Sequence, residues 1–444
     1  MHIQLSDHFT YPRLLRFVMP SIVMMVFTSI YSVVDGLFVS NLVGKVPFAA
    51  INLIMPFLMA LSVIGFMVGT GGSAIVSRSL GEGKRDRAQQ EFSLLVWTTA
   101  FFGVVTTVLG LLFLRPVSLA LGAQGEMLEN CILYGGISLL AQTPFMLQVL
   151  FQSFFVTAEK PRLGLGVTVA AGVTNMVLDA LFIAVFHWGL AGAAIATALS
   201  QVVGGLFPLF YFARPNSSLL RLVRPRMDWG VLRRTCTNGS SELMSNLSSS
   251  LVNALYNFQL LRLVGEDGVA AYGVIMYVCF IFAAVFLGYS IGSAPIVGFH
   301  YGAGHQEELK NLLQKSLVII GCGGVSMLLL AEWAAGPLSR IFVGYDAALM
   351  ELTRRGFRLY ALSFLLSGFN IFGSGFFTAL SNGPVSAAIS FLRTLVFQTA
   401  AILLLPMVLP GADGIWLAIV AAELLALAVT AAFFVSRRKQ YHYW

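Results

Sequence analysis

The sequence predicts an all-α polytopic membrane protein in which 12 transmembrane helices form two six-helix lobes that repeat in parallel. Of its 444 residues, 57% are hydrophobic and only 11% are charged, whereas soluble domains carry about 25% charged residues. The mean hydropathy is +0.83. Since a spanning helix uses about 20–25 residues, the chain has room for roughly 12 spans with short connections. This composition excludes a secreted disulfide scaffold, a nucleic-acid-binding domain and most soluble enzymes.

Apolar runs separated by glycine, proline and charged residues mark the expected spans. Lipid offers no partner for unpaired backbone amides, so nearly all of the chain must be helical. The first six spans are expected near residues 14–39, 48–76, 92–113, 134–158, 164–186 and 190–212. The second six are expected near residues 238–262, 269–299, 316–338, 357–380, 384–408 and 411–436.

Basic residues alternate between the connections. Of the 27 Lys and Arg, 19 lie before the first span, in four connections between spans, and in the C-terminal tail, whereas seven lie in the alternate connections and their flanks. This bias follows the positive-inside rule and predicts that both termini are cytoplasmic. The net charge of +7 is therefore explained by membrane topology, and no nucleic-acid partner is expected.

The two halves of the chain repeat each other at an offset of 221–222 residues. At this offset Leu42–Gly44 returns as Leu263–Gly265, Ile75-Val76 as Ile296-Val297, and Gly81 and Gly83 as Gly302 and Gly304. We expect an N-terminal lobe over residues 1–213, a basic cytoplasmic linker over 214–235 and a C-terminal lobe over 236–444. Each repeat has an even number of spans, so both enter the membrane in one orientation, which is a transporter architecture.

An ion gradient is the expected energy source. No G-x-x-x-x-G-K-[ST] phosphate-binding loop occurs, and the nearest string, Gly81-Glu82-Gly83-Lys84, lacks its spacing. The sequence also lacks a nucleophile–base pair, a metal-ligand cluster and any cofactor motif, so we expect neither an enzyme nor a cofactor.

Membrane-embedded acids are the candidate ion ligands. Asp35 and Asp179 are the clearest, and each would cost about 2.5–3.5 kcal/mol at a bilayer centre. Counted at 1.5 Å per residue from the outer ends of their spans, Asp35 lies roughly 6 Å deep, Asp179 and Thr197 roughly 10 Å, and Asn175 roughly 16 Å. Two carboxylates with amide and hydroxyl oxygens suit Na⁺, whereas carboxylates close enough to repel each other suit H⁺.

The second lobe does not repeat this set. At the 221-residue offset Asp35 corresponds to Tyr256 and Asp179 to Ala400, so the coupling machinery is expected to be one-sided. Glu423, in the middle of the last span, and Glu242, near the start of the seventh, are further acids whose part in coupling stays open.

Several motifs along the whole chain point to one family. They are Pro20 fifteen residues before Asp35, Gly81-Glu82-Gly83 after the second span, Thr157-Ala158-Glu159-Lys160-Pro161 before the fifth, and Asn175-x-x-x-Asp179 followed by Gly189-Leu190-Ala191-Gly192-Ala193-Ala194-Ile195-Ala196-Thr197. In combination the chain resembles MATE (multidrug and toxin extrusion) transporters, specifically the bacterial MepA-like branch. The resemblance implies a MATE-like two-lobe fold, a multi-pass protein of the bacterial inner (plasma) membrane, and antiport of drugs, mostly organic cations, against H⁺ or Na⁺.

The resemblance also implies roles for particular residues. Asp35 corresponds to the first-helix acid whose protonation accompanies bending at Pro20, the hinge. Asn175, Asp179 and Thr197 correspond to the remaining cation ligands, Tyr31 to a neighbouring tyrosine, and Gln152 to a ligand that is often Asn in the family. Some members carry an acid midway along span seven, where this chain has Leu247-Ser248-Ser249-Ser250-Leu251.

The substrate cavity is predicted from polar residues at helical spacing on span seven, namely Asn253, Tyr256 and Asn257. Phe and Met, numbering 36 and 16, suit an adaptable cavity for organic cations. A monomer in the lipid bilayer is expected. The alternatives are a lipid-linked-precursor flippase or metabolite exporter of the same superfamily; a flippase would favour a cationic cavity, against which the scarcity of interior Lys and Arg argues. A channel is disfavoured by the one-sided pair of carboxylates.

Overall fold

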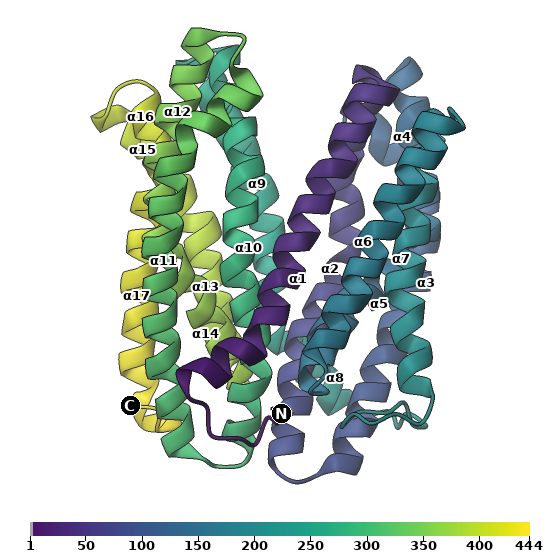
Figure 1. Ribbon diagram of the computed structural model, residues 1–444, viewed down its shortest axis with the longest axis vertical. Coiled ribbons are helices and arrows are strands. Elements are labelled where there is room, and N and C mark those ends of the chain that lie inside the picture. The colour runs from purple at the N-terminus through teal and green to yellow at the C-terminus, as the bar shows by residue number, and fades with distance from the viewer. Residues whose placement is uncertain (1–2) are drawn as a thin grey trace.

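The computed structural model describes residues 3–444, which form helices and no β-strand. Figure 1 shows two groups of upright helices that converge at one end of the molecule and diverge at the other. The first lobe contains α1 (Tyr11–Phe38), η1 (Val39–Val43), α2 (Lys45–Gly81), α3 (Arg85–Ala120), α4 (Gly125–Leu140), α5 (Gln142–Thr157), α6 (Pro161–Asp179), η2 (Ala180–Val185) and α7 (Gly189–Ala213).

The second lobe follows a short connecting helix, α8 (Trp229–Asn238), which falls within and just beyond the predicted linker. It contains α9 (Ser240–Leu263), α10 (Glu266–Gly302), α11 (Gln306–Val343), α12 (Ala347–Ala361), α13 (Phe364–Ala379), α14 (Gly383–Phe391), η3 (Leu392–Phe397), α15 (Gln398–Val408), α16 (Ala412–Trp416) and α17 (Ala418–Tyr441). The three segments labelled η are π-helical turns inside longer helices.

The helices account for 12 passages through the membrane, six in each lobe. Within residues 3–444, nine helices are long and apolar enough to span by themselves, and two bent pairs, α4 with α5 (56°) and α12 with α13 (48°), bring the number to eleven. The twelfth is α9, whose 24 residues are rich in serine and asparagine and occupy the position in the repeat that α1 occupies in the first lobe. The predicted all-α, two-lobe architecture is confirmed.

The two bent pairs differ from the continuous spans expected near 134–158 and 357–380. Helix begins earlier, at Gly125 and Ala347, and the chain bends at Ala141 and at Leu362–Ser363. Pro144 lies in the first turn of α5, where the missing N–H of proline would have no intrahelical partner in any case. The bend therefore costs little backbone hydrogen bonding.

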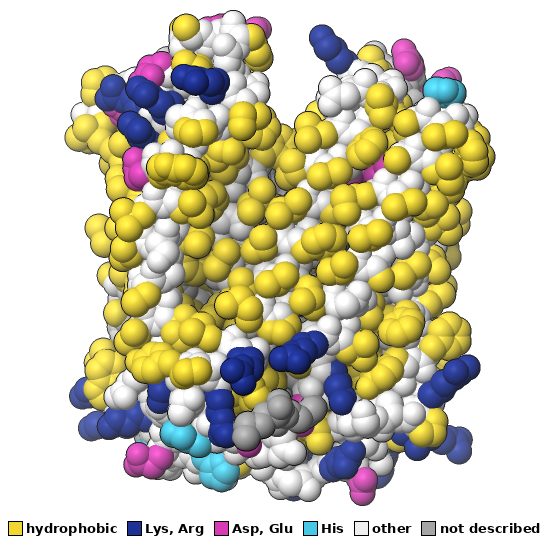
Figure 2. All heavy atoms as spheres, viewed as in Figure 1, with side chains coloured by type: hydrophobic (Ala, Val, Ile, Leu, Met, Phe, Trp, Pro, Cys, Tyr) yellow, Lys and Arg dark blue, Asp and Glu magenta, His cyan; other side chains and the backbone are white. Residues whose placement is uncertain are grey.

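Charged side chains divide the molecule into two ends. Figure 2 shows an apolar band around the middle, with most Lys and Arg on this face gathered below it. Both termini lie at that lower end (Figure 1), which we call the basic end. The opposite end, which we call the open end, is hollowed between the lobes (Figure 2).

Two helices of the first lobe, α1 and α2, make the main contacts with the second lobe. Helix α1 packs on α6 of its own lobe and on α10 of the other, while α2 packs on α8, α9 and α10. Backbones approach closely at glycines: a Cβ on Gly288 would fall 2.5 Å from the Cα of Ile22 in α1, and a Cβ on Gly239 would overlap the carbonyl oxygen of Met67 in α2. Small residues at such crossings allow helix backbones to pack without intervening side chains.

Candidate ion-coupling site

Asp35 and Asp179 lie side by side in the first lobe. Helices α1 and α6 both begin at the basic end, so Asp35, three residues before the end of α1, and Asp179, the last residue of α6, lie toward the open end. Their carboxyl groups lie close enough to interact electrostatically. Asp179 is fully buried, and Asp35 is partly exposed.

Among residues 3–444, no cationic side chain pairs with these two carboxylates. Both carboxyl oxygens of Asp179 and Oδ1 of Asp35 are buried without a hydrogen-bond donor among residues 3–444. Like charges in contact repel strongly in a low dielectric, and a buried charge without a partner is costly. The pair is therefore suited to share a proton or to bind a cation.

Asn175 and Thr197 complete an oxygen-rich cluster beside Asp179. Asn175 lies one turn earlier on α6, and its Nδ2 donates a 3.3 Å hydrogen bond to Oγ1 of Thr197 on α7. This bond orients the amide, and the Oδ1 atom of Asn175 is buried without a donor in the described part of the chain. Oxygen atoms of this kind are ligands for hard cations. The structure thus brings four of the predicted ion ligands together.

Aromatic side chains pack beside this cluster. Tyr31 precedes Asp35 by one turn and lies close to it. Its ring rests on Gly172 of α6, where a Cβ would fall 2.8 Å from the ring atom Cδ1. Tyr134 of α4 is buried near both carboxylates and near Ser138 and Thr197. Sequence reasoning missed Tyr134, because a tyrosine in an apolar run is indistinguishable from packing.

A second glutamine of α5 lies beside this group of residues. Gln148, which is 6% exposed, lies near Tyr31 and packs against Gly204 of α7. Gln152, the glutamine that was expected to be a ligand, lies one turn nearer the basic end on the same helix. Its role as a ligand stays a prediction, and Gln148 is a further candidate; both residues share one helix face, which is why spacing did not separate them.

The predicted substrate residues on α9 divide into two groups. Asn253 and Asn257 are exposed, together with Ser249 and Ser250, and Asn253 accepts a 2.8 Å hydrogen bond from Tyr272. Tyr256 is only 1% exposed and stacks on Tyr272, so it is packed inside the second lobe in this conformation, and its role in substrate binding stays a prediction. Helix α9 contacts α2 and borders the first lobe, and a polar stripe on a spanning helix faces water rather than lipid.

Glu423 is neutralised within the second lobe. Nε of Arg393, in the π-helical turn η3, donates 2.8 and 3.0 Å hydrogen bonds to its two oxygens. Asn370 donates to Oε2 at 2.7 Å and accepts from Thr430 at 3.0 Å. Glu423 is thus a fully partnered buried acid, unlike the pair in the first lobe, while Glu242 lies in the first turn of α9.

Three kinds of similarity place the chain among known proteins. The sequence model of the MatE family matches residues 20–181 and 243–402. The multidrug export protein MepA of Staphylococcus saprophyticus is 23% identical over 421 residues, covering 94% of this chain and 91% of that protein. MepA of Staphylococcus aureus is 22% identical over 419 residues, with the same coverage.

Solved structures share the fold. A crystal structure of MATE in complex with MaL6 superposes with a TM-score of 0.93 at 22% identity, covering 98% of this chain and 97% of that one. An outward-facing multidrug resistance MATE family transporter of the MOP superfamily superposes at 0.91 with 22% identity, covering 96% and 95%. The match of the family model in both halves, over most of the chain, shows that this multi-pass membrane protein belongs to the MatE family of transporters.

Proposed function

We propose that this protein exports small organic compounds, mostly cations, from a bacterial cell in exchange for H⁺ or Na⁺. The relatives that it resembles along almost its full length are multidrug export proteins. The basic end and both termini face the cytoplasm in this proposal, in accord with the distribution of Lys and Arg. The structure then represents the outward-open state.

The observation that carries the proposal is the unneutralised pair of Asp35 and Asp179. A coupling ion can drive transport only if it binds the outward-open and inward-open states with different affinity. Asp35 lies on α1, which contacts both lobes, whereas Asp179 lies on α6 within one lobe. A proton or Na⁺ between them favours one position of α1 over another, so ion binding is linked to the relative position of the lobes.

Pro20 provides a place where α1 can bend. Proline in a helix interior lacks an N–H and clashes with the preceding turn, which weakens the helix at that point. Pro20 is buried in the basic half of α1, four turns before Asp35. Bending here moves the segment that carries Asp35 relative to the part of α1 nearer the N-terminus.

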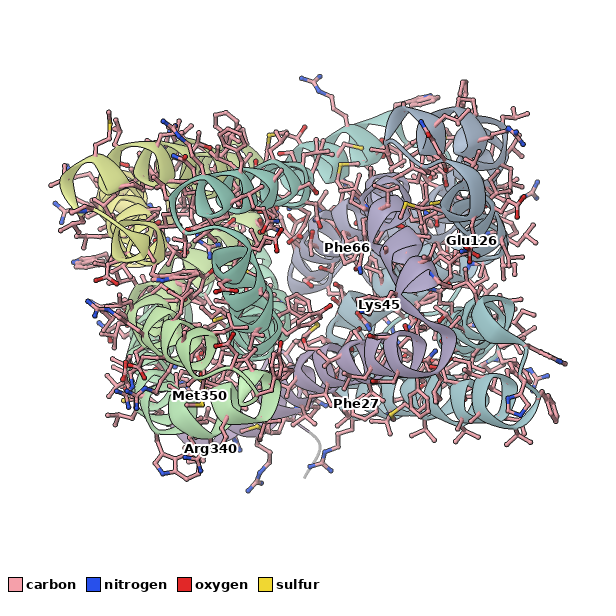
Figure 3. All side chains as sticks on the ribbon, turned by 90° about the horizontal axis from the view of Figure 1, so that it is seen from above. Phe27, Lys45, Phe66, Glu126, Arg340 and Met350 are labelled. Carbon is pink, nitrogen blue, oxygen red and sulfur yellow. The ribbon has the colours of Figure 1, made fainter. Side chains whose placement is uncertain are left out.

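The substrate is proposed to bind between the lobes. Figure 3 looks down on the open end and shows Phe66 of α2 on the side of the first lobe that faces the second lobe, with Glu126 farther out. Aromatic faces attract organic cations, and the polar stripe of α9 offers hydrogen-bonding groups. A flippase for lipid-linked pyrophosphates would need a cationic cavity, but Arg393 in the spans is neutralised by Glu423.

The test is export by purified protein in liposomes with a pH gradient or a Na⁺ gradient imposed separately. We expect one gradient to drive uptake of a fluorescent organic cation by wild type and Asp35→Asn to abolish it. Glu126→Gln, an exposed acid at the open end, serves as the matched control and should transport normally. Undiminished gradient-driven transport by Asp35→Asn would overturn the proposed coupling role.

A further inference from the structure

A cavity of about 650 Å³ lies at the basic end, where α8 meets both lobes. Its walls come from α2 and α3 of the first lobe, from the connecting helix α8, and from residues 381–384 at the start of α14 in the second lobe. A space of this size holds a small-molecule ligand. The cavity exists only while the two lobes are together at this end, because neither lobe supplies all its walls.

The cavity is strongly basic. Four arginines line it, Arg78, Arg87, Arg233 and Arg234, against a single carboxylate, Glu82. Arg78 pairs with Glu82 at 3.2 Å, and Arg87 pairs with Glu91 at 3.0 Å. Arg233 and Arg234 have no carboxylate partner in the part of the chain that the structure describes. We call this space the arginine cavity.

Glu82 does not remove the excess of positive charge. Its hydrogen bond to Lys84, and its contact with Arg78, hold the pKa of its carboxyl below the usual value, so it is ionised at neutral pH. One carboxylate shared by Arg78 and Lys84 leaves the α8 arginines uncompensated. Adjacent like charges repel, so an anion in the cavity would relieve this repulsion.

Uncharged polar groups in the walls also lack partners. The Ser381 hydroxyl and Oδ1 of Asn238 are buried without a hydrogen bond among residues 3–444, and Asn238 is 2% exposed. Nδ2 of Asn238 already joins the lobes, donating to the carbonyl oxygens of Gly71 and Thr378. The Ser381 hydroxyl is a donor that a bound anion could use, whereas Oδ1 of Asn238 is an acceptor and adds nothing to anion binding.

We propose that the arginine cavity binds a phosphate-bearing anion, and that the bound anion holds the lobes together at the basic end. Guanidinium groups bind phosphate through paired, charge-assisted hydrogen bonds. Separation of the lobes at this end would withdraw residues 381–384 from the arginines and dismantle the site. A ligand that binds only the assembled cavity shifts the protein toward the state in which this end is closed. The cavity is thus a regulatory site that favours the outward-open conformation.

Binding of inorganic pyrophosphate to the full-length protein in neutral detergent tests the site, with isothermal titration calorimetry as the readout. We expect wild type to bind and Arg233→Gln/Arg234→Gln to lose affinity by about tenfold or more, the change that corresponds to roughly 1.4 kcal/mol. The matched control is Arg224→Gln/Arg226→Gln, which removes two exposed linker arginines outside the cavity. Equal losses in both double variants, or no binding by wild type, would overturn the proposal.

Glu82→Gln gives a prediction of opposite sign. It removes the one carboxylate in the walls and frees Arg78, so pyrophosphate should bind more tightly than to wild type. A variant that merely perturbs folding cannot gain affinity, which separates this result from structural damage. Unchanged or weaker binding by Glu82→Gln would contradict an anion site at this position.

The phosphate can come from solution or from a lipid headgroup, and nanodiscs distinguish the sources. If the natural ligand is an anionic phospholipid, pyrophosphate should bind in phosphatidylcholine nanodiscs and be displaced in phosphatidylglycerol nanodiscs. Equal binding in both would identify a soluble phosphate compound. In either case, pyrophosphate should slow hydrogen–deuterium exchange in α8 and at residues 381–384 of wild type but not of Arg233→Gln/Arg234→Gln. An absence of this protection in wild type would show that the anion does not hold the lobes together.

Discussion

Gly81 of α2 and Gly302 of α10 form a reciprocal contact between the lobes at the basic end. A Cβ on Gly81 would overlap the carbonyl oxygen of Phe299, and a Cβ on Gly302 would overlap the carbonyl oxygen of Arg78. Arg78 and Phe299 are separated by 221 residues, as are Gly81 and Gly302. The duplicated halves therefore meet through equivalent backbone positions, and this end can close only because both positions lack side chains.

Adding a methyl group here should open the basic end. Gly302→Ala places a Cβ against backbone that cannot rotate away, and overpacking of this kind costs about 1–3 kcal/mol. We expect faster hydrogen–deuterium exchange at the basic ends of α2 and α10. Gly273→Ala is the control, because a Cβ at this position on the same helix has nothing within 4 Å. If the two variants exchange alike, the contact does not hold this end closed.

Removing one carboxylate from the ion site should stabilise the protein and abolish coupling. Asp179→Asn ends the repulsion with Asp35 and supplies an amide donor to it, and relief of functional strain commonly yields about 0.5–2 kcal/mol. Thermal unfolding in detergent should shift upward while gradient-driven export is lost. Asp267 is an acid in the first turn of α10, and Asp267→Asn should change neither the unfolding temperature nor gradient-driven export strongly. A lower unfolding temperature for Asp179→Asn would contradict the assignment of an unneutralised pair.

Removing one member of the buried ion pair between Arg393 and Glu423 in the second lobe should destabilise the protein. Glu423 is 1% and Arg393 22% exposed, and truncating one partner of a buried pair costs about 3–5 kcal/mol. Glu423→Gln should therefore lower the unfolding temperature, and Glu423→Leu combined with Arg393→Met should recover much of the loss. The exposed pair of Arg355 and Asp413 is the comparison, and Arg355→Gln should have a much smaller effect. If the variant with both Glu423→Leu and Arg393→Met still transports under the driving gradient, Glu423 has a structural role.

The two glutamines of α5 provide a direct comparison of positions one turn apart. Gln148→Ala removes the group within reach of Tyr31 and should weaken gradient-driven export by about tenfold, which corresponds to one polar contact of about 1.4 kcal/mol. Gln152→Ala should transport at nearly the wild-type rate. The initial rate of substrate uptake into liposomes under the driving gradient measures both. The reverse order of effects would assign the ligand role to Gln152 and not to Gln148.

Composition and the internal repeat were sufficient to predict the two-lobe helical architecture. Spans, repeat and the basic bias are local properties of the chain, because lipid forces each segment to satisfy its own backbone and duplication leaves an offset that can be counted. Asp35, Asp179, Asn175 and Thr197 could be predicted as ligands because polar groups are rare and costly inside spans. These residues lie together in the structure, with Asn175 bonded to Thr197.

The tertiary structure decided what depends on helix rotation and on contacts between lobes. The place of Gln148 near Tyr31 and the burial of Tyr256 follow from which faces of α5 and α9 pack inward, and one helix face offers several equivalent positions. The neutralisation of Glu423 by Arg393 depends on helices that are 30 residues apart in the chain. By itself the sequence determined a duplicated type of membrane transporter; only packing determined which buried charges are paired, because pairing is a relation between helices.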